Sequence, residues 1–328
     1  MKAAIYTRYG PPDVVQVTDV EKPAPQDNEV LMKVRAASLN PADWHLMRGL
    51  PYFLRLATGL RNPKIARLGA DVAGQVEAVG RNVANFKPGD QVFGCCRGSF
   101  AEFACAPESR LAPKPGNLTF QQAACAGVAA LTALQAFRDK GHLQPGEKVL
   151  INGAAGGVGT FAVQIAKSFG AEVTGVCSSR NLEMVRSLGA DRVIDYTREN
   201  FTKAGQRYNL ILDCIGNHPL SACKRVLAAH GRYLGVGGPS GKWMLGSLAG
   251  AILLPFFSQF GSRKVIVFLA SVNKDDLTYL GDLMASGKLT PVIDRRYPLR
   301  ELPEAIRHLE TGHARGKVVI TLDPPRTT

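Results

Sequence analysis

A glycine-rich turn in this sequence has the spacing of a dinucleotide-binding site. The strand-like run KVLIN leads into GAAGGVG, and the helix-like run VGTFAVQIAKSFG follows it. The spacing of Ala154, Gly156 and Gly159 is an AxGxxG variant of the dinucleotide fingerprint, in the order strand, turn, helix, second strand. Glycines let the backbone approach a pyrophosphate, towards which the N–H groups at the helix start point. A tight turn without a ligand is the alternative; otherwise we expect dinucleotide contacts from Ala155, Gly156, Gly157, Val158 and Gly159.

The end of the second predicted strand indicates which dinucleotide binds. An NAD site of this type carries an acidic residue about 20 positions after the glycines, where it accepts hydrogen bonds from the ribose. Here the strand ends in VCSSRN, so Ser178, Ser179 and Arg180 take that place and no carboxylate is present in the stretch. Hydroxyl groups and a guanidinium suit a 2′-phosphate, which predicts NADPH. If Arg180 is only a solvated arginine at a helix start, the preference between NADPH and NADH stays open.

Two regions of different sequence pattern must position these residues. The 328 residues, 45% of them hydrophobic, are enough for two domains. Residues 1–125 show short alternating runs broken by Pro and Gly, the pattern of a small antiparallel barrel. From 126 onwards strands alternate with helices, including a helix over 220–231, which predicts a parallel sheet covered on both faces. We expect a dinucleotide domain at 126–266, a second domain from 1–125 with 267–328, and a pocket in the cleft between them.

Further motifs, weak singly, together give the chain a family resemblance. They are MKAAIYTRYGPPDVVQV, ASLNPADWHLMRG, GADVAGQVEAVG, FKPGDQVFG, GSFAEFA, LTALQAF, SLGADRVIDY and HARGKVVI. With the glycine turn, they make the chain similar over essentially its whole length to the medium-chain dehydrogenase/reductase superfamily. The match is closest to the zinc-independent quinone oxidoreductase branch, with its reticulon-interacting and chloroplast-envelope homologues. The resemblance implies an α/β fold: a GroES-like β-barrel catalytic domain plus a Rossmann domain with a doubly wound parallel sheet.

The resemblance also implies cofactor contacts outside the glycine turn. Thr132 would lie near the nicotinamide amide, Tyr196 would pack by the adenosine phosphate, and Lys317 would close the site from the last strand. The ends of the later strands would line the cofactor with Ile215, Gly216, Gly235, Val236, Gly237, Phe268, Leu269 and Ala270. For Ile215, Val236 and Phe268, ordinary core packing is the alternative.

The metal ligands of zinc-dependent superfamily members are missing from this sequence. Asn40 stands where those members carry Cys, and Gly-Ala-Asp at 69–71 stands where they carry Gly-His-Glu. A catalytic zinc needs about three protein ligands, and the six scattered histidines do not replace those lost. Cys95 and Cys96, in VFGCCRGSFAEFAC, are adjacent and do not match the spacing of a structural zinc lobe. We expect no metal, and we interpret the seven cysteines as reduced, buried thiols.

Loss of the metal directs the predicted chemistry towards activated double bonds. Alcohol oxidation is difficult without a Lewis acid, whereas a quinone or an α,β-unsaturated carbonyl takes a hydride at carbon and needs only a hydrogen-bond donor at oxygen. Asn40 is the candidate for that role, or else a cap of the helix PADWHLMRG. Asp43 is expected to be a first-turn helix charge.

Tyr52 is a candidate proton donor, with plain packing as its alternative. The apolar run at 244–257 is expected to form a pocket wall for a small apolar electrophile, or a dimer contact.

Charge and segment lengths bear on partners and location. The net charge is +13, and five basic residues without an acid lie between Trp44 and Ala70. This segment is either a solvated flap or a contact for an anionic substrate, a membrane surface or nucleic acid. An enoyl-thioester reductase, or a non-catalytic NADPH-binding protein that contacts nucleic acid, is therefore the alternative function. No signal peptide and no apolar run of ~20 residues is visible, so we expect a cytoplasmic protein, and by resemblance a homodimer.

Overall fold

The chain is described here from a computed structural model, and the residues described are 1–52, 54–64, 66–237 and 263–322. These residues form two compact units, Met1–Leu131 with Ser271–Thr328, and Thr132–Ala270. The domain limits expected from the sequence, at 125/126 and 266/267, stay a prediction. The apolar run at 244–257 lies outside the described residues.

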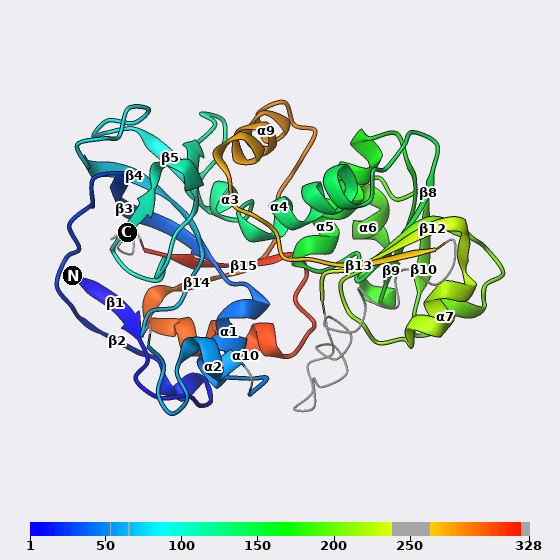
Figure 1. The fold of residues 1–328 in the computed structure, drawn as a ribbon, viewed down its shortest axis with the longest axis horizontal. Helices are drawn as coiled ribbons and strands as arrows, with labels where there is room; N and C mark the ends of the chain where they lie inside the picture. The colour runs from blue at the N-terminus through cyan, green and yellow to red at the C-terminus, as the bar shows by residue number, and fades with distance from the viewer. Residues whose placement is uncertain (53, 65, 238–262, 323–328) are drawn as a thin grey trace. The chain divides into compact units, whose positions relative to one another are not determined.

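The first unit is built on a sheet whose strand pairs are antiparallel except for one (Figure 1). Its strand order is β14-β15-β3-β4-β5-β7, with β6 on β3, and the β14–β15 pair is parallel. A separate antiparallel pair, β1 (Lys2–Ile5) with β2 (Gln16–Asp19), completes the strands of this unit among the described residues. The seven strands are β3 (Glu29–Ser38), β4 (Asp71–Val79), β5 (Gln91–Cys95), β6 (Phe103–Pro107), β7 (Leu111–Pro113), β14 (Ile293–Pro298) and β15 (Lys317–Thr321).

Helices pack against the strands of this sheet. Helix α1 (Pro41–Arg48) starts at a proline whose fixed φ suits a first turn, and it stops before Gly49, which adopts a left-handed φ of 58°. Helix α10 (Leu302–Glu310) buries its apolar face in one hydrophobic cluster with β15. The remaining helices are α2 (Leu54–Thr58), α3 (Phe120–Ala124), α9 (Lys274–Ala285) and α4 (Val128–Gln135), which continues past the division at 131/132 into a π-helical turn, Ala136–Lys140.

The second unit contains the predicted parallel sheet. Its order is β10-β9-β8-β11-β12-β13, and every pair is parallel. After β8 the chain adds β9 and β10 on one side and then returns to add β11 on the other, so the strand order reverses between β8 and β11. In such sheets a ligand binds at the carboxyl ends of the strands at this reversal. The elements are β8 (Lys148–Asn152), α5 (Gly157–Ser168), β9 (Glu172–Cys177), α6 (Leu182–Ser187), β10 (Arg192–Asp195), β11 (Tyr208–Asp213), α7 (Leu220–Arg225), β12 (Leu227–Gly235) and β13 (Lys264–Val267).

One predicted helix is shorter than its pattern indicates. The expectation of a helix over 220–231 is wrong beyond Arg225, because the chain enters β12 at Leu227. Leu227 is fully buried and pairs with Tyr208 of β11, and the register shifts before Leu210 pairs with Arg232. Burial and strand pairing thus override the helix preference of the alanines that follow.

Candidate functional site

The glycine turn leaves a space at the start of α5. A Cβ atom at Gly159 would lie 2.1 Å from the carbonyl oxygen of Gly153, so the helix needs glycine there to pack on the turn. A Cβ atom at Gly156 would meet only that same oxygen within 4 Å, at 3.4 Å, so this position faces open space. The N–H groups of a first helical turn have no acceptor within their own helix. Gly157, Val158 and their neighbour Gly159 therefore present donors of the kind that hold a phosphate.

Thr132 lies in α4 and Lys317 begins β15, whereas the other predicted cofactor residues outside the glycine turn lie along one edge of the same sheet. All six strands are parallel, so residues that follow strand ends collect at the carboxyl edge. Ile215 is 42% exposed, Leu269 is 96% exposed, and Val236 and Phe268 are partly exposed, so none of them is plain core. The contacts themselves stay predictions. The residues at this edge are Ser178, Ser179 and Arg180 after β9, Tyr196 after β10, Ile215 and Gly216 after β11, Gly235, Val236 and Gly237 at and after the end of β12, and Phe268, Leu269 and Ala270 after β13.

A buried carboxylate that the sequence reasoning missed shapes the turn after β11. Asp213 is fully buried, and its Oδ1 accepts hydrogen bonds from the backbone N–H groups of Ile215 (3.0 Å) and Gly216 (2.8 Å). The side-chain amide of Asn152, at the end of β8, donates to the same oxygen at 2.9 Å. The hydroxyl of Tyr233 donates to Oδ2 at 2.8 Å, and burial, followed by the charge of Asp213, raises the pKa of Tyr233. This network fixes the backbone where the strand order reverses.

A second carboxylate lies where the sequence predicts none. Asp195, the last residue of β10, pairs with Cys177, the last residue of β9. Its Oδ2 accepts a hydrogen bond from the hydroxyl of Ser179 at 2.6 Å. The end of the second strand itself carries no acid, as the sequence predicts, but in the folded chain the end of the third strand brings one beside it. The single signal for it was the Asp of VIDY, eighteen positions after Cys177 in the sequence.

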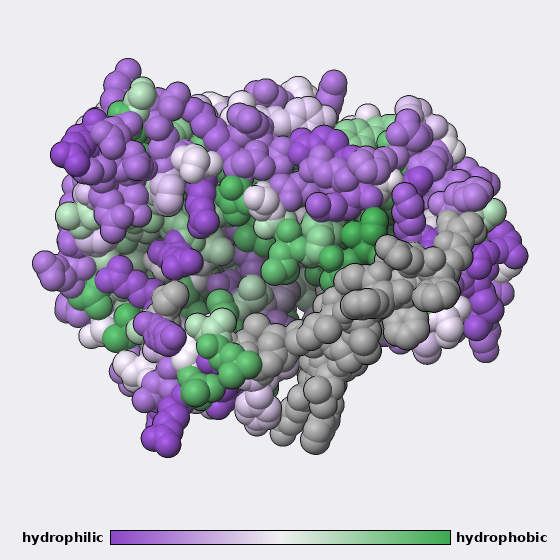
Figure 2. Space-filling model, viewed as in Figure 1, coloured by the Kyte–Doolittle hydropathy of each residue, from purple (hydrophilic) through white to green (hydrophobic). Residues whose placement is uncertain are grey.

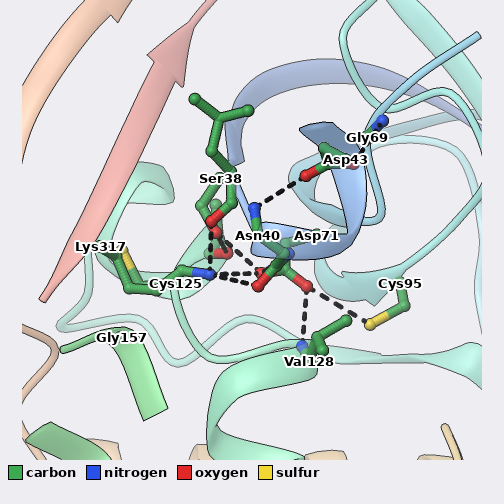
Figure 3. Close-up of polar contacts among 12 residues, drawn as sticks. Ser38, Asn40, Asp43, Gly69, Asp71, Cys95, Cys125, Val128, Gly157 and Lys317 are labelled. Atoms are coloured by element: carbon green, nitrogen blue, oxygen red, sulfur yellow. Dashed lines mark hydrogen bonds and ion pairs between the residues drawn. The ribbon is translucent and has the colours of Figure 1, made fainter. Parts of the chain in front are cut away.

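The first unit holds a buried polar cluster around Asn40 (Figure 3). The ammonium of Lys317 donates to the side-chain oxygen of Asn40 (2.7 Å), to the carbonyl oxygen of Leu39 (2.9 Å) and to Oδ2 of Asp71 (3.1 Å). The side-chain N–H of Asn40 donates to the same Asp71 oxygen at 2.9 Å. The amide of Asn40 is thus oriented at both ends, with its oxygen on a cation and its nitrogen on an anion. All three N–H bonds of Lys317 have acceptors in this cluster, and its predicted cofactor contact stays a prediction.

Asp71 connects the cluster to three other chain segments. The hydroxyl of Ser38 lies 2.8 Å from Oδ2, and the backbone N–H of Val128, at the start of α4, donates to Oδ1 at 2.7 Å. The thiol of Cys95 lies 3.8 Å from Oδ1. A Cβ atom at Gly127 would lie 2.3 Å from that oxygen, so only glycine fits before Val128. A fully buried charge with this many partners indicates a rigid site rather than a solvated one.

Asp43 lies in the first turn of α1, as the sequence predicts, and it also caps the start of that helix. Its Oδ2 accepts from the backbone N–H of Asn40 at 2.8 Å, and its Oδ1 accepts from the N–H of Gly69 at 3.0 Å. Burial, and to a smaller extent the charge of Asp71, raises the pKa of Asp43 to about 7. Because Asp43 caps the start of α1, the side chain of Asn40 is available for its contacts with Asp71 and Lys317.

Tyr52 lies on an exposed and partly apolar segment. Its side chain is 65% exposed, and its ring lies 4.9 Å from the guanidinium of Arg55, which also stacks on Tyr9 at 4.5 Å. Leu56 and Leu60 are exposed nearby, and Figure 2 shows hydrophobic residues over α2. A role of Tyr52 in proton transfer stays a prediction, as does the partner of this segment.

One charge of the basic segment between Trp44 and Ala70 is paired with an acid from another part of the chain. Arg48 forms an ion pair with Glu310 of α10, and the side chain of Arg55 donates to the carbonyl oxygens of Gly49 and Arg48. Arg61 and Lys64 remain exposed. The structure therefore offers less free positive charge here than the sequence indicates.

The cysteines are packed thiols. All seven are free, and Cys95, Cys96, Cys125, Cys177 and Cys223 are buried, which confirms the sequence interpretation for these five. Burial raises the pKa of the Cys125 thiol to about 12, so the thiolate form that binds metals is disfavoured.

Within residues 1–52, 54–64, 66–237 and 263–322, no group of three or more His, Cys, Asp and Glu side chains is arranged to hold a metal ion. Nor does this part of the chain contain a helix with the length and apolar character to cross a bilayer.

Comparisons with known proteins agree with this architecture. The family model for the alcohol dehydrogenase GroES-like domain matches residues 26–116, and that for a zinc-binding dehydrogenase matches residues 188–320. The chloroplast envelope quinone oxidoreductase homolog of Arabidopsis thaliana is 35% identical over 338 residues, which cover 98% of each chain. The chloroplastic NADPH-dependent alkenal/one oxidoreductase of the same plant is 35% identical over 335 residues, 98% of this chain and 79% of its own.

Solved structures agree as well. The quinone oxidoreductase of Coxiella burnetii superposes with a TM-score of 0.86 at 33% identity, covering 98% of this chain and 99% of its own. The Escherichia coli quinone oxidoreductase complexed with NADPH gives a TM-score of 0.83 at 25% identity, covering 98% and 100%. The predicted fold, with its GroES-like and Rossmann parts, is confirmed. This chain belongs to the medium-chain dehydrogenase/reductase superfamily and, within it, to the quinone oxidoreductase branch.

Proposed function

We propose that this protein is an NADPH-dependent oxidoreductase that transfers a hydride to a quinone or an α,β-unsaturated carbonyl compound. The glycine turn and the fixed backbone after β11 support the cofactor part of the proposal. Relatives whose names specify quinone or alkenal/one reduction, and which match 98% of the chain, support the acceptor class. The observation that carries the chemistry is the orientation of the Asn40 amide between Lys317 and Asp71.

The chain's own residues would divide the work as follows. The N–H groups at the start of α5 hold the pyrophosphate, and the residues at the carboxyl edge of the sheet orient the nicotinamide, which supplies the hydride when bound. In the first unit, the Asn40 side chain carries two N–H bonds, and one of them is directed to Asp71. The second donates to the acceptor oxygen, where negative charge develops as the hydride arrives at carbon. A donor that is already oriented stabilises this charge without reorganisation.

We infer that the reaction proceeds without a catalytic metal. Positive charge near the acceptor oxygen comes from the ammonium of Lys317, which lies 2.7 Å from the Asn40 oxygen and polarises the amide. The side chain of Ala70 has no atom that can bind a metal, and burial raises the pKa of the Cys125 thiol to about 12. A hydrogen bond of this kind suits an acceptor that is already electron-poor, and it does not suit the deprotonation of an alcohol.

Three finer statements complete the proposal. The 2′-phosphate of NADPH would contact Ser178, Ser179 and Arg180. The protein would form a homodimer, for which the edge strand β13, with Val267 48% exposed, is a candidate surface. Seven free cysteines suit a reducing compartment such as the cytoplasm.

The test is NADPH oxidation against a panel of quinones, enones, enals, simple ketones and alcohols, with metal content assayed on the same sample. We expect turnover with quinones or enones that resists chelators and does not scale with zinc. Stoichiometric zinc together with alcohol oxidation would contradict the proposal. NADPH binding without turnover across the panel, with salt-sensitive binding to RNA or acyl-thioester carriers, would point to the alternative functions instead.

A further inference from the structure

Asp195 brings a carboxylate to the corner of the cradle that binds the adenosine ribose in related folds. In an NAD site the acidic residue stands at the end of the second strand and accepts hydrogen bonds from the ribose hydroxyls. Here the second strand, β9, ends at Cys177, and the third strand, β10, ends at Asp195 in direct register with it. The backbone N–H of Tyr196 donates to the carbonyl oxygen of Cys177 at 3.1 Å, which holds the two strand ends together. Sheet pairing thus supplies from the third strand the acid that the second strand lacks.

The carboxylate is held at both oxygens. Oδ2 accepts from the Ser179 hydroxyl at 2.6 Å and lies 3.7 Å from Nε of Arg198. Oδ1 accepts from the hydroxyl of Thr197 at 2.7 Å and from its backbone N–H at 3.0 Å. The hydrogen bond from Ser179, then those from Thr197 and the charge of Arg198, keep the pKa of Asp195 below its usual range. Asp195 is therefore an anion at neutral pH.

This arrangement determines what Ser179 offers to a ligand. Its single hydroxyl proton is directed to Asp195, and the Thr197 hydroxyl, 3.2 Å from the Ser179 oxygen, donates to Asp195 as well. The exposed Ser179 oxygen therefore offers a ligand its lone pairs. A ribose 2′-hydroxyl is a donor and finds an acceptor in that oxygen. A 2′-phosphate needs donors and meets a neighbouring carboxylate of like charge. Arg180, on the same turn, acts in the opposite direction because a guanidinium attracts phosphate.

We propose that Asp195 sets the cofactor selectivity of this protein. Through Ser179 it opposes the 2′-phosphate that Arg180 attracts, so that the site takes NADH as well as NADPH. This inference rests on the proposed function for its ligand class, but it concerns the ratio of two affinities rather than the existence of turnover.

The test uses two fragments of the cofactors, 2′,5′-ADP and 5′-AMP, with calorimetric titration of the full chain. The change is Asp195→Asn, which removes the charge, keeps the shape and lets the new amide donate to Ser179, whose proton is then free for a phosphate. We expect the affinity ratio of 2′,5′-ADP to 5′-AMP to rise by about tenfold, mainly through tighter binding of 2′,5′-ADP. The ratio of KM values for NADH and NADPH should rise in parallel.

A matched control removes the same charge just before the other end of the same strand. Asp191 precedes β10 at its other end, where it pairs with Lys167 at 2.8 Å and accepts from the N–H of Val173. Asp191→Asn should leave the affinity ratio unchanged. Asp195→Ala, which removes the charge without adding a donor, is the second variant and should raise the ratio in the same direction if the Asn variant does not fold.

The outcomes separate the two proposals. If wild-type protein binds both fragments and neither Asp195 variant changes the ratio relative to Asp191→Asn, the role of Asp195 is refuted and the proposed function stands. If wild-type protein binds neither fragment, the cofactor assignment itself fails, and the selectivity proposal fails with it.

Discussion

Two fully buried carboxylates, one in each unit, are stabilised in different ways. Asp71 in the first unit shares its charge with the ammonium of Lys317, whereas the described partners of Asp213 in the second unit are neutral donors from Asn152, Tyr233 and two backbone N–H groups. The ion pair orients a side chain, the Asn40 amide. The neutral network orients backbone, the turn that follows β11. The difference suggests that the first unit supplies a polar group for chemistry and the second supplies a shaped surface for binding.

The largest expected effect comes from removing the cation of the first unit. Lys317→Met leaves Asp71 buried without its counter-charge and Asn40 without the donor on its oxygen. We expect a loss of about 3–5 kcal/mol in the free energy of unfolding, measured by urea denaturation, together with loss of turnover.

A double variant provides the control for this prediction. Asp71→Asn combined with Lys317→Met removes both charges, so it should recover much of the stability while turnover stays low. If the single and double variants are equally stable, leaving the buried charge of Asp71 without Lys317 does not destabilise the fold, which would contradict the account of the ion pair.

The next effect concerns Asp43, a third buried carboxylate close to the charged pair. Its pKa of about 7 is raised above the ordinary value of 3.8, so the folded chain binds a proton there more tightly than the unfolded chain does. The stability from this group is complete below about pH 4 and is lost as the pH rises to about 7. The free energy of unfolding of wild type should therefore fall relative to Asp43→Asn over this range, by at most about 1.4 kcal/mol per pH unit. Denaturation curves of both proteins at several pH values measure this change. A difference in the free energy of unfolding that stays constant with pH would show that Asp43 is ionised throughout.

A smaller effect is expected in the neutral network of the second unit. Tyr233→Phe removes one hydrogen bond to Asp213 and leaves the other three donors in place. We expect a loss of about 2 kcal/mol in the free energy of unfolding, since this bond is to a charged group. Weaker NADPH binding with unchanged kcat should accompany it, whereas a fall in kcat alone would mean that the network acts on chemistry rather than on binding.

The smallest effect is expected at the exposed edge of the sheet. Arg180→Ala should raise the KM for NADPH by about tenfold and leave the KM for NADH nearly unchanged, because only the former has a 2′-phosphate. Steady-state kinetics with both cofactors measure this change. Equal effects on the two cofactors would remove the phosphate contact from Arg180.

Local patterns in the sequence predicted the fold and the glycine turn. Strand, turn and helix follow one another within residues 148–168, so their order carries the whole signal. The polar clusters depend instead on residues far apart in the chain. Lys317 and Asp71 are 246 positions apart, and Asn152 and Asp213 are 61 apart. No local pattern encodes such pairs.

Strand register accounts for two further differences. Asp195 reaches Ser179 only because β10 pairs with β9 with Asp195 beside Cys177, which the sequence does not state. Likewise, residues after Arg225 have helical preference, but pairing of Leu227 with Tyr208 makes them strand. Asn40 was recognised as a candidate because a motif singled it out, and its two orienting partners became visible only in the folded chain.

The most direct test of the central claim is the rate of hydride transfer in Asn40→Ala, measured by rapid mixing of the NADPH complex with a quinone in metal-free protein. Asn273→Ala is the matched control, because it removes an asparagine from a helix N-terminus, that of α9, outside the polar cluster. We predict a rate about 10²–10³-fold below wild type for Asn40→Ala, with unchanged NADPH affinity and no change in the control. An unchanged rate in Asn40→Ala, or a wild-type rate that appears only when zinc is added, would contradict the account.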